Sequence, residues 1–205
     1  NGTSGTAIEI SYNDINIEDL WIISSEKGVF LNAANDISIS TIRFTGNEYA
    51  IYVEDSQGAL IDNSEFDLED YGIYFTGSSS GATVEYNNFS NATESAIHQS
   101  ESDENGDTSI HNNAFNDCAI GWQSGSSSNT FSDNTLKDNI YGVRLTGTES
   151  HDNMINSNSF DDSLVGIYIY NAAYDNNLFN NEFDDSDNSD IKLSDSSDTV
   201  SYNNT

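Results

Sequence analysis

The chain has 205 residues, enough for one sizeable domain, and carries 35 acidic residues against 5 lysines and arginines, a formal net charge of -30. This charge repels nucleic-acid phosphates and anionic lipid headgroups, so we expect no nucleic-acid partner. A single cysteine excludes an internal disulfide. Apolar runs, such as residues 20–23, are far too short for membrane insertion.

A four-residue unit recurs along the chain: a small residue, an apolar residue, any residue, and usually a second apolar residue. Apolar residues two positions apart predict β-strand, because alternate side chains of a strand share one face. Successive units start 21 to 24 residues apart. The nine units are residues 7–10, 28–31, 50–53, 72–75, 96–99, 119–122, 142–145, 166–169 and 190–193.

A second signature follows most of these units: two apolar residues five positions apart, with asparagine usually three positions after the first. Asparagine tolerates the left-handed backbone of tight turns, and its amide both donates and accepts hydrogen bonds. We therefore predict an internal asparagine ladder that runs through one turn of most coils, with the first two coils departing from the pattern. Its predicted members are Ser64, Asn87, Asn113, Asn134, Asn158 and Asn181, with Val200 and Asn203 starting the next unit.

Short strands at this period predict a solenoid: one right-handed parallel β-helix domain over residues 1–205, with about nine coils of 21–24 residues. The motif G-I-x-[FLI] followed by apolar-x-x-N-x-F resembles the repeat of the NosD-like and carbohydrate-binding/sugar-hydrolase family. The resemblance implies the fold but leaves function open, because that family includes lyases, epimerases, hydrolases and non-catalytic surface proteins. Without polar caps, the domain is expected to be a segment of a longer protein or to self-associate end to end.

The third residue of each four-residue unit, between the two apolar positions, should point outward. These residues should form a stripe along one flat sheet. This stripe and its neighbour offer aromatic rings on which sugars could stack, with polar side chains beside them. The alternative is that exposed aromatics on strands merely pack against the next rung. The candidate ligand-binding residues are Tyr52, Glu54, Tyr74, Thr76, Gln123, Tyr168 and Tyr170.

An enzymatic alternative centres on His98 and Arg144, predicted to lie two rungs apart with Gly121 leaving space between them. A uronate lyase or epimerase needs a base, a cation for the carboxylate and an acid for the leaving group. His98, Arg144 and Tyr168 could take these three roles, with calcium helping to bind a polyuronate. The resemblance makes such a site plausible without matching a catalytic motif residue by residue.

For metals, the sequence offers Asp103, Asn105 and Asp107, which resemble the start of a calcium loop but lack its closing glutamate. A solvated turn is the alternative interpretation. The three histidines, one cysteine and Met154 fall at different coil phases, so copper handling is not expected.

These observations favour a structural or carbohydrate-binding segment of an acidic extracellular or cell-surface protein over an enzyme. Such acidity suits a salty or calcium-rich medium, where ions screen self-repulsion, and a salt-adapted (halophilic) source would fit it. The expected partner is a polysaccharide or cell-surface glycan. A calcium-assisted polysaccharide lyase or epimerase, and a filament or sheath subunit that stacks end to end, stay open as alternatives.

Overall fold

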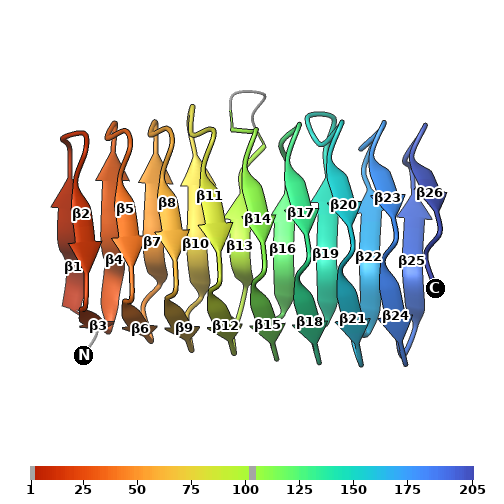
Figure 1. The fold of residues 1–205 in the computed structure, drawn as a ribbon, viewed down its shortest axis with the longest axis horizontal. Helices are drawn as coiled ribbons and strands as arrows, with labels where there is room; N and C mark the ends of the chain where they lie inside the picture. The colour runs from red at the N-terminus through yellow and green to blue at the C-terminus, as the bar shows by residue number, and fades with distance from the viewer. Residues whose placement is uncertain (1–2, 102–104) are drawn as a thin grey trace.

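The computed structural model describes residues 3–101 and 105–205, which form an all-β parallel solenoid without a helix in these ranges (Figure 1). Successive coils contribute strands in turn to three parallel sheets, which contain nine, nine and eight strands among the described residues. Sheet A contains β1 (Thr3–Ile10), β4 (Ser25–Asn32), β7 (Tyr49–Glu54), β10 (Tyr71–Thr76), β13 (Ser95–Gln99), β16 (Ile120–Ser124), β19 (Tyr141–Thr146), β22 (Val165–Tyr170) and β25 (Ser189–Ser194).

The other two sheets consist of three-residue strands. Sheet B contains β2 (Asn16–Glu18), β5 (Ser38–Ser40), β8 (Leu60–Asp62), β11 (Thr83–Glu85), β14 (Ser109–His111), β17 (Thr130–Ser132), β20 (Met154–Asn156), β23 (Asn177–Phe179) and β26 (Val200–Tyr202). Sheet C contains β3 (Trp21–Ile23), β6 (Arg43–Thr45), β9 (Glu65–Asp67), β12 (Asn88–Ser90), β15 (Ala114–Asn116), β18 (Thr135–Lys137), β21 (Ser159–Asp161) and β24 (Glu182–Asp184).

The core fills the interior because equivalent apolar side chains stack from coil to coil. In sheet C the rings of Phe44, Phe66, Phe89 and Phe115 form a stacked column with centroids 4.5 to 5.0 Å apart. This column is fully buried, so each ring is removed from water and also packs against its neighbours. Repetition of one small packing unit thus replaces the single large core of a globular domain.

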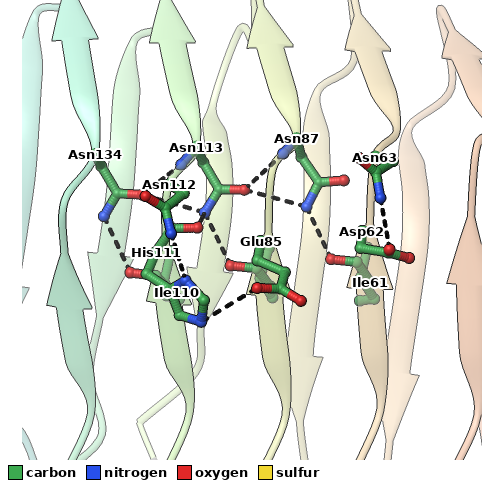
Figure 2. Close-up of polar contacts among 11 residues, drawn as sticks. Ile61, Asp62, Asn63, Glu85, Asn87, Ile110, His111, Asn112, Asn113 and Asn134 are labelled. Atoms are coloured by element: carbon green, nitrogen blue, oxygen red, sulfur yellow. Dashed lines mark hydrogen bonds and ion pairs between the residues drawn. The ribbon is translucent and has the colours of Figure 1, made fainter.

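The predicted asparagine ladder is confirmed in the turn between sheets B and C, the B–C turn (Figure 2). The Oδ1 of Asn113 accepts a hydrogen bond from the backbone N of Asn87 at 2.9 Å, and its Nδ2 donates to the carbonyl of Val84 at 2.9 Å. One prediction is wrong at the end of the ladder: Asn181 donates to Asn204, because Leu178 pairs with Ser201. The rung predicted at Val200 and Asn203 is therefore one residue out of register.

The turn between sheets A and B, the A–B turn, holds a second amide ladder that was not predicted. The backbone N of Asn129 donates to Asn153 Oδ1, and that of Asn153 donates to Asn176 Oδ1, both at 3.0 Å. The three side chains are buried. Each of the three lies two residues before the first member of an apolar pair, at Phe131, Ile155 and Leu178. Earlier coils carry Ala59, Ala82 and Thr108 at this position, so asparagine does not recur there along the whole chain.

Much of the acidity has a structural cause. Among the described residues, half of the non-glycine residues with positive φ are aspartates, which lie at the left-handed positions of the turns. Aspartate, like asparagine, adopts this conformation more readily than most residues. Successive coils therefore stack carboxylates along the edges of the solenoid, as at Asp117, Asp138, Asp162 and Asp185 in the turn between sheets C and A, the C–A turn.

The sixth coil differs from the predicted register. Trp122, rather than Ile120, pairs with Ile97, which shifts the outward position from Gly121 to Gln123. Gly121 faces the packed interior: a Cβ there would lie 2.6 Å from the carbonyl oxygen of Gly142. Trp122 is fully buried and donates from Nε1 to Gln99 Oε1 at 2.9 Å, which fixes this register.

Candidate functional site

The outward face of sheet A gathers most of the predicted site residues. Tyr52, Tyr74, His98, Gln123, Arg144 and Tyr168 occupy one column of successive rungs, here called the central stripe, together with Glu9, Phe30 and Lys192. Glu54 and Thr76 pair with each other in the next outward column, as do Thr146 and Tyr170. Gln123 was predicted in that second column; the shift at Trp122 places it in the central stripe instead.

The N-terminal half of the face is an aromatic stack. Tyr52 and Tyr74 lie parallel with centroids 5.3 Å apart, and the His98 ring stacks on Tyr74 at 4.7 Å. A third outward column contributes Tyr49 and Tyr71, also stacked, which meet Tyr74 edge to face. All five rings are half-buried, so each still presents an accessible edge or face.

The third column was missed because sheet A strands interrupt the alternation of inward and outward residues. In β7, both Ala50 and Ile51 are buried, so the outward positions are Tyr49, Tyr52 and Glu54. A strict period of two predicts the last two of these and places Tyr49 on the inside. Recurrence of tyrosine three residues before the central stripe, at Tyr49, Tyr71 and Tyr141, is the signal that could have identified this column.

The C-terminal half of the face combines rings with positive charge. Tyr168 stacks on Tyr170 at 4.5 Å, the Lys192 ammonium lies 4.8 Å from the Tyr168 ring centroid, and the Arg144 guanidinium lies 5.7 Å from that of Tyr141. At the other end of the face, Lys27 lies 3.7 Å from the Tyr52 ring centroid. Three of the five lysines and arginines are therefore on this face of a highly acidic protein.

The proposed catalytic residues occupy one column but are not adjacent. Gln123 separates His98 from Arg144, and an Arg144 Nη2 hydrogen bond to Gln123 Oε1 fills the space predicted to be open at Gly121. Tyr168 lies three rungs from His98, about 14 Å at the usual strand spacing. Burial, with a smaller contribution from the Arg144 charge, lowers the pKa of His98 to about 4, so its imidazole is neutral and weakly basic at pH 7.

The calcium-loop residues do not converge where the structure describes them. Asp103 lies outside the described residues. Asn105 is fully buried and donates from Nδ2 to the carbonyl of Phe75 at 3.0 Å, whereas Asp107 is exposed at a left-handed turn position.

Sequence comparison assigns the family. The family described as "Periplasmic copper-binding protein (NosD)" matches residues 1–106 and 97–205, the whole chain. The chain belongs to the NosD family. This assignment confirms the resemblance of the repeat motif, and no curated protein matches the chain.

Solved structures similar to this NosD-family chain are carbohydrate-related β-helix proteins. The DFA-IIIase from Arthrobacter chlorophenolicus A6 without its lid has a TM-score of 0.69 at 14% identity over 87% of this chain and 52% of that one. The tailspike of E. coli bacteriophage HK620, in complex with a pentasaccharide, has a TM-score of 0.62 at 15% identity over 87% of this chain and 41% of that one. The alginate lyase from Paenibacillus sp. str. FPU-7 has a TM-score of 0.53 at 14% identity over 100% and 77%.

These identities establish a shared fold and no more. The NosD-family chain spans about half the length of the DFA-IIIase that it matches. Among the described residues, no helix is long and apolar enough to cross a membrane.

The family description raises the question of copper. His98 is on sheet A, His111 on sheet B and His151 in an A–B turn, while Cys118 is buried and burial raises the pKa of its thiol to about 11. Within residues 3–101 and 105–205, no group of three histidine, cysteine, aspartate or glutamate side chains could hold a metal ion. These residues do not fit a copper site.

Proposed function

We propose that the outward face of sheet A is a carbohydrate-binding surface on a module that acts outside the cytoplasm, in the periplasm or at the cell surface. The observation that carries this proposal is the concentration on one flat face of stacked tyrosines and of three of the five cationic side chains. Sugars stack their apolar C–H faces on aromatic rings, and flanking polar groups fix their orientation.

The cations extend the ligand range to acidic sugars. A net charge of -30 repels a polyuronate, yet Arg144 and Lys192 lie beside Tyr168 in the central stripe and supply local positive charge. Carboxylate groups of a glycan could pair with these cations, while its rings stack on Tyr168 and Tyr170. We therefore favour a polysaccharide or cell-surface glycan that carries some carboxylates.

The lyase or epimerase alternative is less well supported by the geometry. A base with a pKa of about 4 accepts a proton poorly at neutral pH, and His98 and Tyr168 are too far apart to act on one sugar ring. Incubation with alginate and calcium tests it: an unsaturated product, monitored by ultraviolet absorbance, would indicate a lyase, and a changed ratio of the two uronate epimers in the NMR spectrum would indicate an epimerase.

Affinity electrophoresis in gels that contain neutral or acidic polysaccharides tests the binding proposal. We expect the parent chain to be retarded by at least one polysaccharide, and Tyr74→Ala or Tyr168→Ala to lose that retardation because each removes a stacking ring. Tyr12→Ala is the matched control, because Tyr12 is 80% exposed and lies outside sheet A. Equal retardation of all variants, or no retardation of the parent, would contradict the proposal.

A further inference from the structure

The B–C turns carry a depression of about 440 Å³ that has no role in the sheet A face. It lies over the coils of β11 and β12, β14 and β15, and β17 and β18. Buried ladder residues Asn87 and Asn113 contribute to its lining. The remaining lining residues are Tyr86, Asn88, Asn112, Ala114, Asp133 and Thr135.

A small residue in a column of larger ones contributes to this depression. Ala114 lies in register between Asn88 and Thr135 at the first position of the sheet C strands. Earlier in the same column stand Trp21, Arg43 and Glu65. The short alanine side chain therefore leaves a notch on the outside of sheet C.

Tyr86 borders this notch in an unusual backbone conformation. Its φ is 55°, and the other left-handed positions of the B–C turns hold small polar residues such as Asn63, Asn112 and Asp133. A bulky residue at positive φ is strained, and such strain concentrates at ligand-binding and catalytic sites. The Tyr86 side chain is nonetheless 56% exposed, so burial of apolar surface does not explain its presence.

Neighbouring side chains form a polar network beside the aromatic ring. The rings of Tyr86 and His111 meet edge to face at 6.5 Å. His111 contacts Glu85 through Nε2 at 3.6 Å and Asn112 through Nδ1 at 3.0 Å (Figure 2). Asn88 Oδ1 accepts from Asn116 Nδ2 at 3.3 Å, which holds its amide at the edge of the notch.

We propose that this notch binds a neutral sugar residue, with the Tyr86 ring as the stacking platform. The amides of Asn88 and Asn112, the Thr135 hydroxyl and the Asp133 carboxylate are the hydrogen-bonding groups for the sugar hydroxyls. An aromatic ring beside planar amides and a carboxylate matches the alternating apolar and hydroxyl faces of a hexose. The Asp133 carboxylate, Glu85 nearby and the net charge of -30 disfavour an anionic ligand.

Titration of the ¹⁵N-labelled full chain with the methyl glycosides of glucose, galactose and mannose tests this site. We expect at least one glycoside to shift the side-chain amide signals of Asn88 and Asn112 in a saturable way at millimolar concentration. Tyr86→Asn, which suits the left-handed conformation, should weaken this binding about tenfold through loss of the ring.

Leu68→Asn is the matched control, because Leu68 is also 56% exposed and has a φ of 60° but lies in a C–A turn. We expect it, and Tyr74→Ala on sheet A, to leave the titration unchanged. The proposal is overturned if none of the three glycosides shifts the Asn88 and Asn112 amides, or if Leu68→Asn weakens binding as much as Tyr86→Asn. Loss of polysaccharide retardation in Tyr74→Ala with an intact glycoside titration would separate this notch from the sheet A face.

Discussion

His98 combines a titratable ring with a half-buried position in the aromatic stack. Its ring lies flat on Tyr74, and in the described structure its Nδ1 is buried without a hydrogen-bond partner. Protonation would place a charge in this poorly solvated position near the Arg144 cation, which is why its pKa is lowered from 6.5 to about 4. The folded protein therefore binds this proton less readily than the unfolded chain.

We predict that His98 contributes to acid sensitivity. The unfolded chain takes up this proton at a higher pH than the folded protein does. Protonation of His98 therefore leaves the free energy of unfolding unchanged above about pH 6.5 and lowers it by on the order of 3 kcal/mol as the pH falls to 4. His98→Gln should remove this part of the loss. Urea unfolding at pH 7 and pH 4 measures it, and an identical pH dependence in parent and variant would contradict the prediction.

Glu69 should make the protein less stable at high pH, the opposite of the effect of His98. It is 1% exposed in the C–A turn, where its Oε2 accepts from the backbone N of Asn47 at 2.6 Å and its Oε1 accepts from Asn47 Nδ2 at 3.3 Å. Burial outweighs these hydrogen bonds and raises its pKa from 4.5 to about 8. Stability should thus be full below about pH 4.5 and decrease as the pH rises toward 8.

Glu69→Gln isolates this effect, because glutamine keeps the shape and the acceptor oxygen without the titration. We predict that the variant is less sensitive than the parent to a change from pH 5 to pH 9 and is more stable at pH 9. Thermal unfolding at the two pH values checks this. Parallel curves for parent and variant would show that Glu69 is not the titrating group.

At the scale of the element, the asparagine ladder connects every coil from Ser64 to the C-terminal rung. Asn113 accepts from Asn87 and donates to Val84, His111 and Asn134, all within 3.2 Å. Asn113→Asp removes the donors and buries a charge, so we predict a loss of about 3 kcal/mol or more. Asn112→Asp, one residue away and exposed at positive φ, should cost far less.

Chemical unfolding of the two variants makes the comparison. Similar midpoints for Asn113→Asp and Asn112→Asp would mean that the amide ladder adds little beyond the stacked apolar core. The comparison is matched, since both substitutions make the same chemical change in the same turn.

The sequence predicted the repeated elements better than their irregularities. Period-two apolar units and spaced asparagines identified the coils because each coil repeats the same local packing. The register of the sixth coil was predicted wrongly, because Ile120 and Trp122 fit the apolar pattern equally well. The observed register follows from a tertiary hydrogen bond between Trp122 and Gln99. The outward positions of Tyr49 and Tyr71 were not predicted, because consecutive buried residues break the alternation of inward and outward side chains in the sheet A strands.

For the whole molecule, stacked carboxylates make stability depend on salt. Equivalent turn positions repeat at each rung, which brings Asp138, Asp162 and Asp185 into one column. Raising salt from about 0.1 M to about 1 M shortens the screening length from roughly 10 to roughly 3 Å, less than the rung spacing. We predict a marked increase in the urea midpoint over this range.

The double variant Asp138→Asn and Asp185→Asn tests the cause, because asparagine retains the left-handed turn and removes two charges. It should raise the midpoint at low salt and have little effect at high salt. An equal gain at both salt concentrations would point to local turn energetics instead of repulsion.

End-to-end self-association stays a prediction, which sedimentation velocity on the same samples tests.

The most direct test of the carbohydrate-binding proposal is a crystal structure with an oligosaccharide prepared from the polysaccharide that retards the parent chain. We predict electron density for sugar rings along sheet A, stacked on the tyrosines between Tyr52 and Tyr170, with any carboxylate near Arg144 or Lys192. Density confined to the B–C turn notch or to another face, with sheet A bare, would contradict the assignment of sheet A as the binding surface.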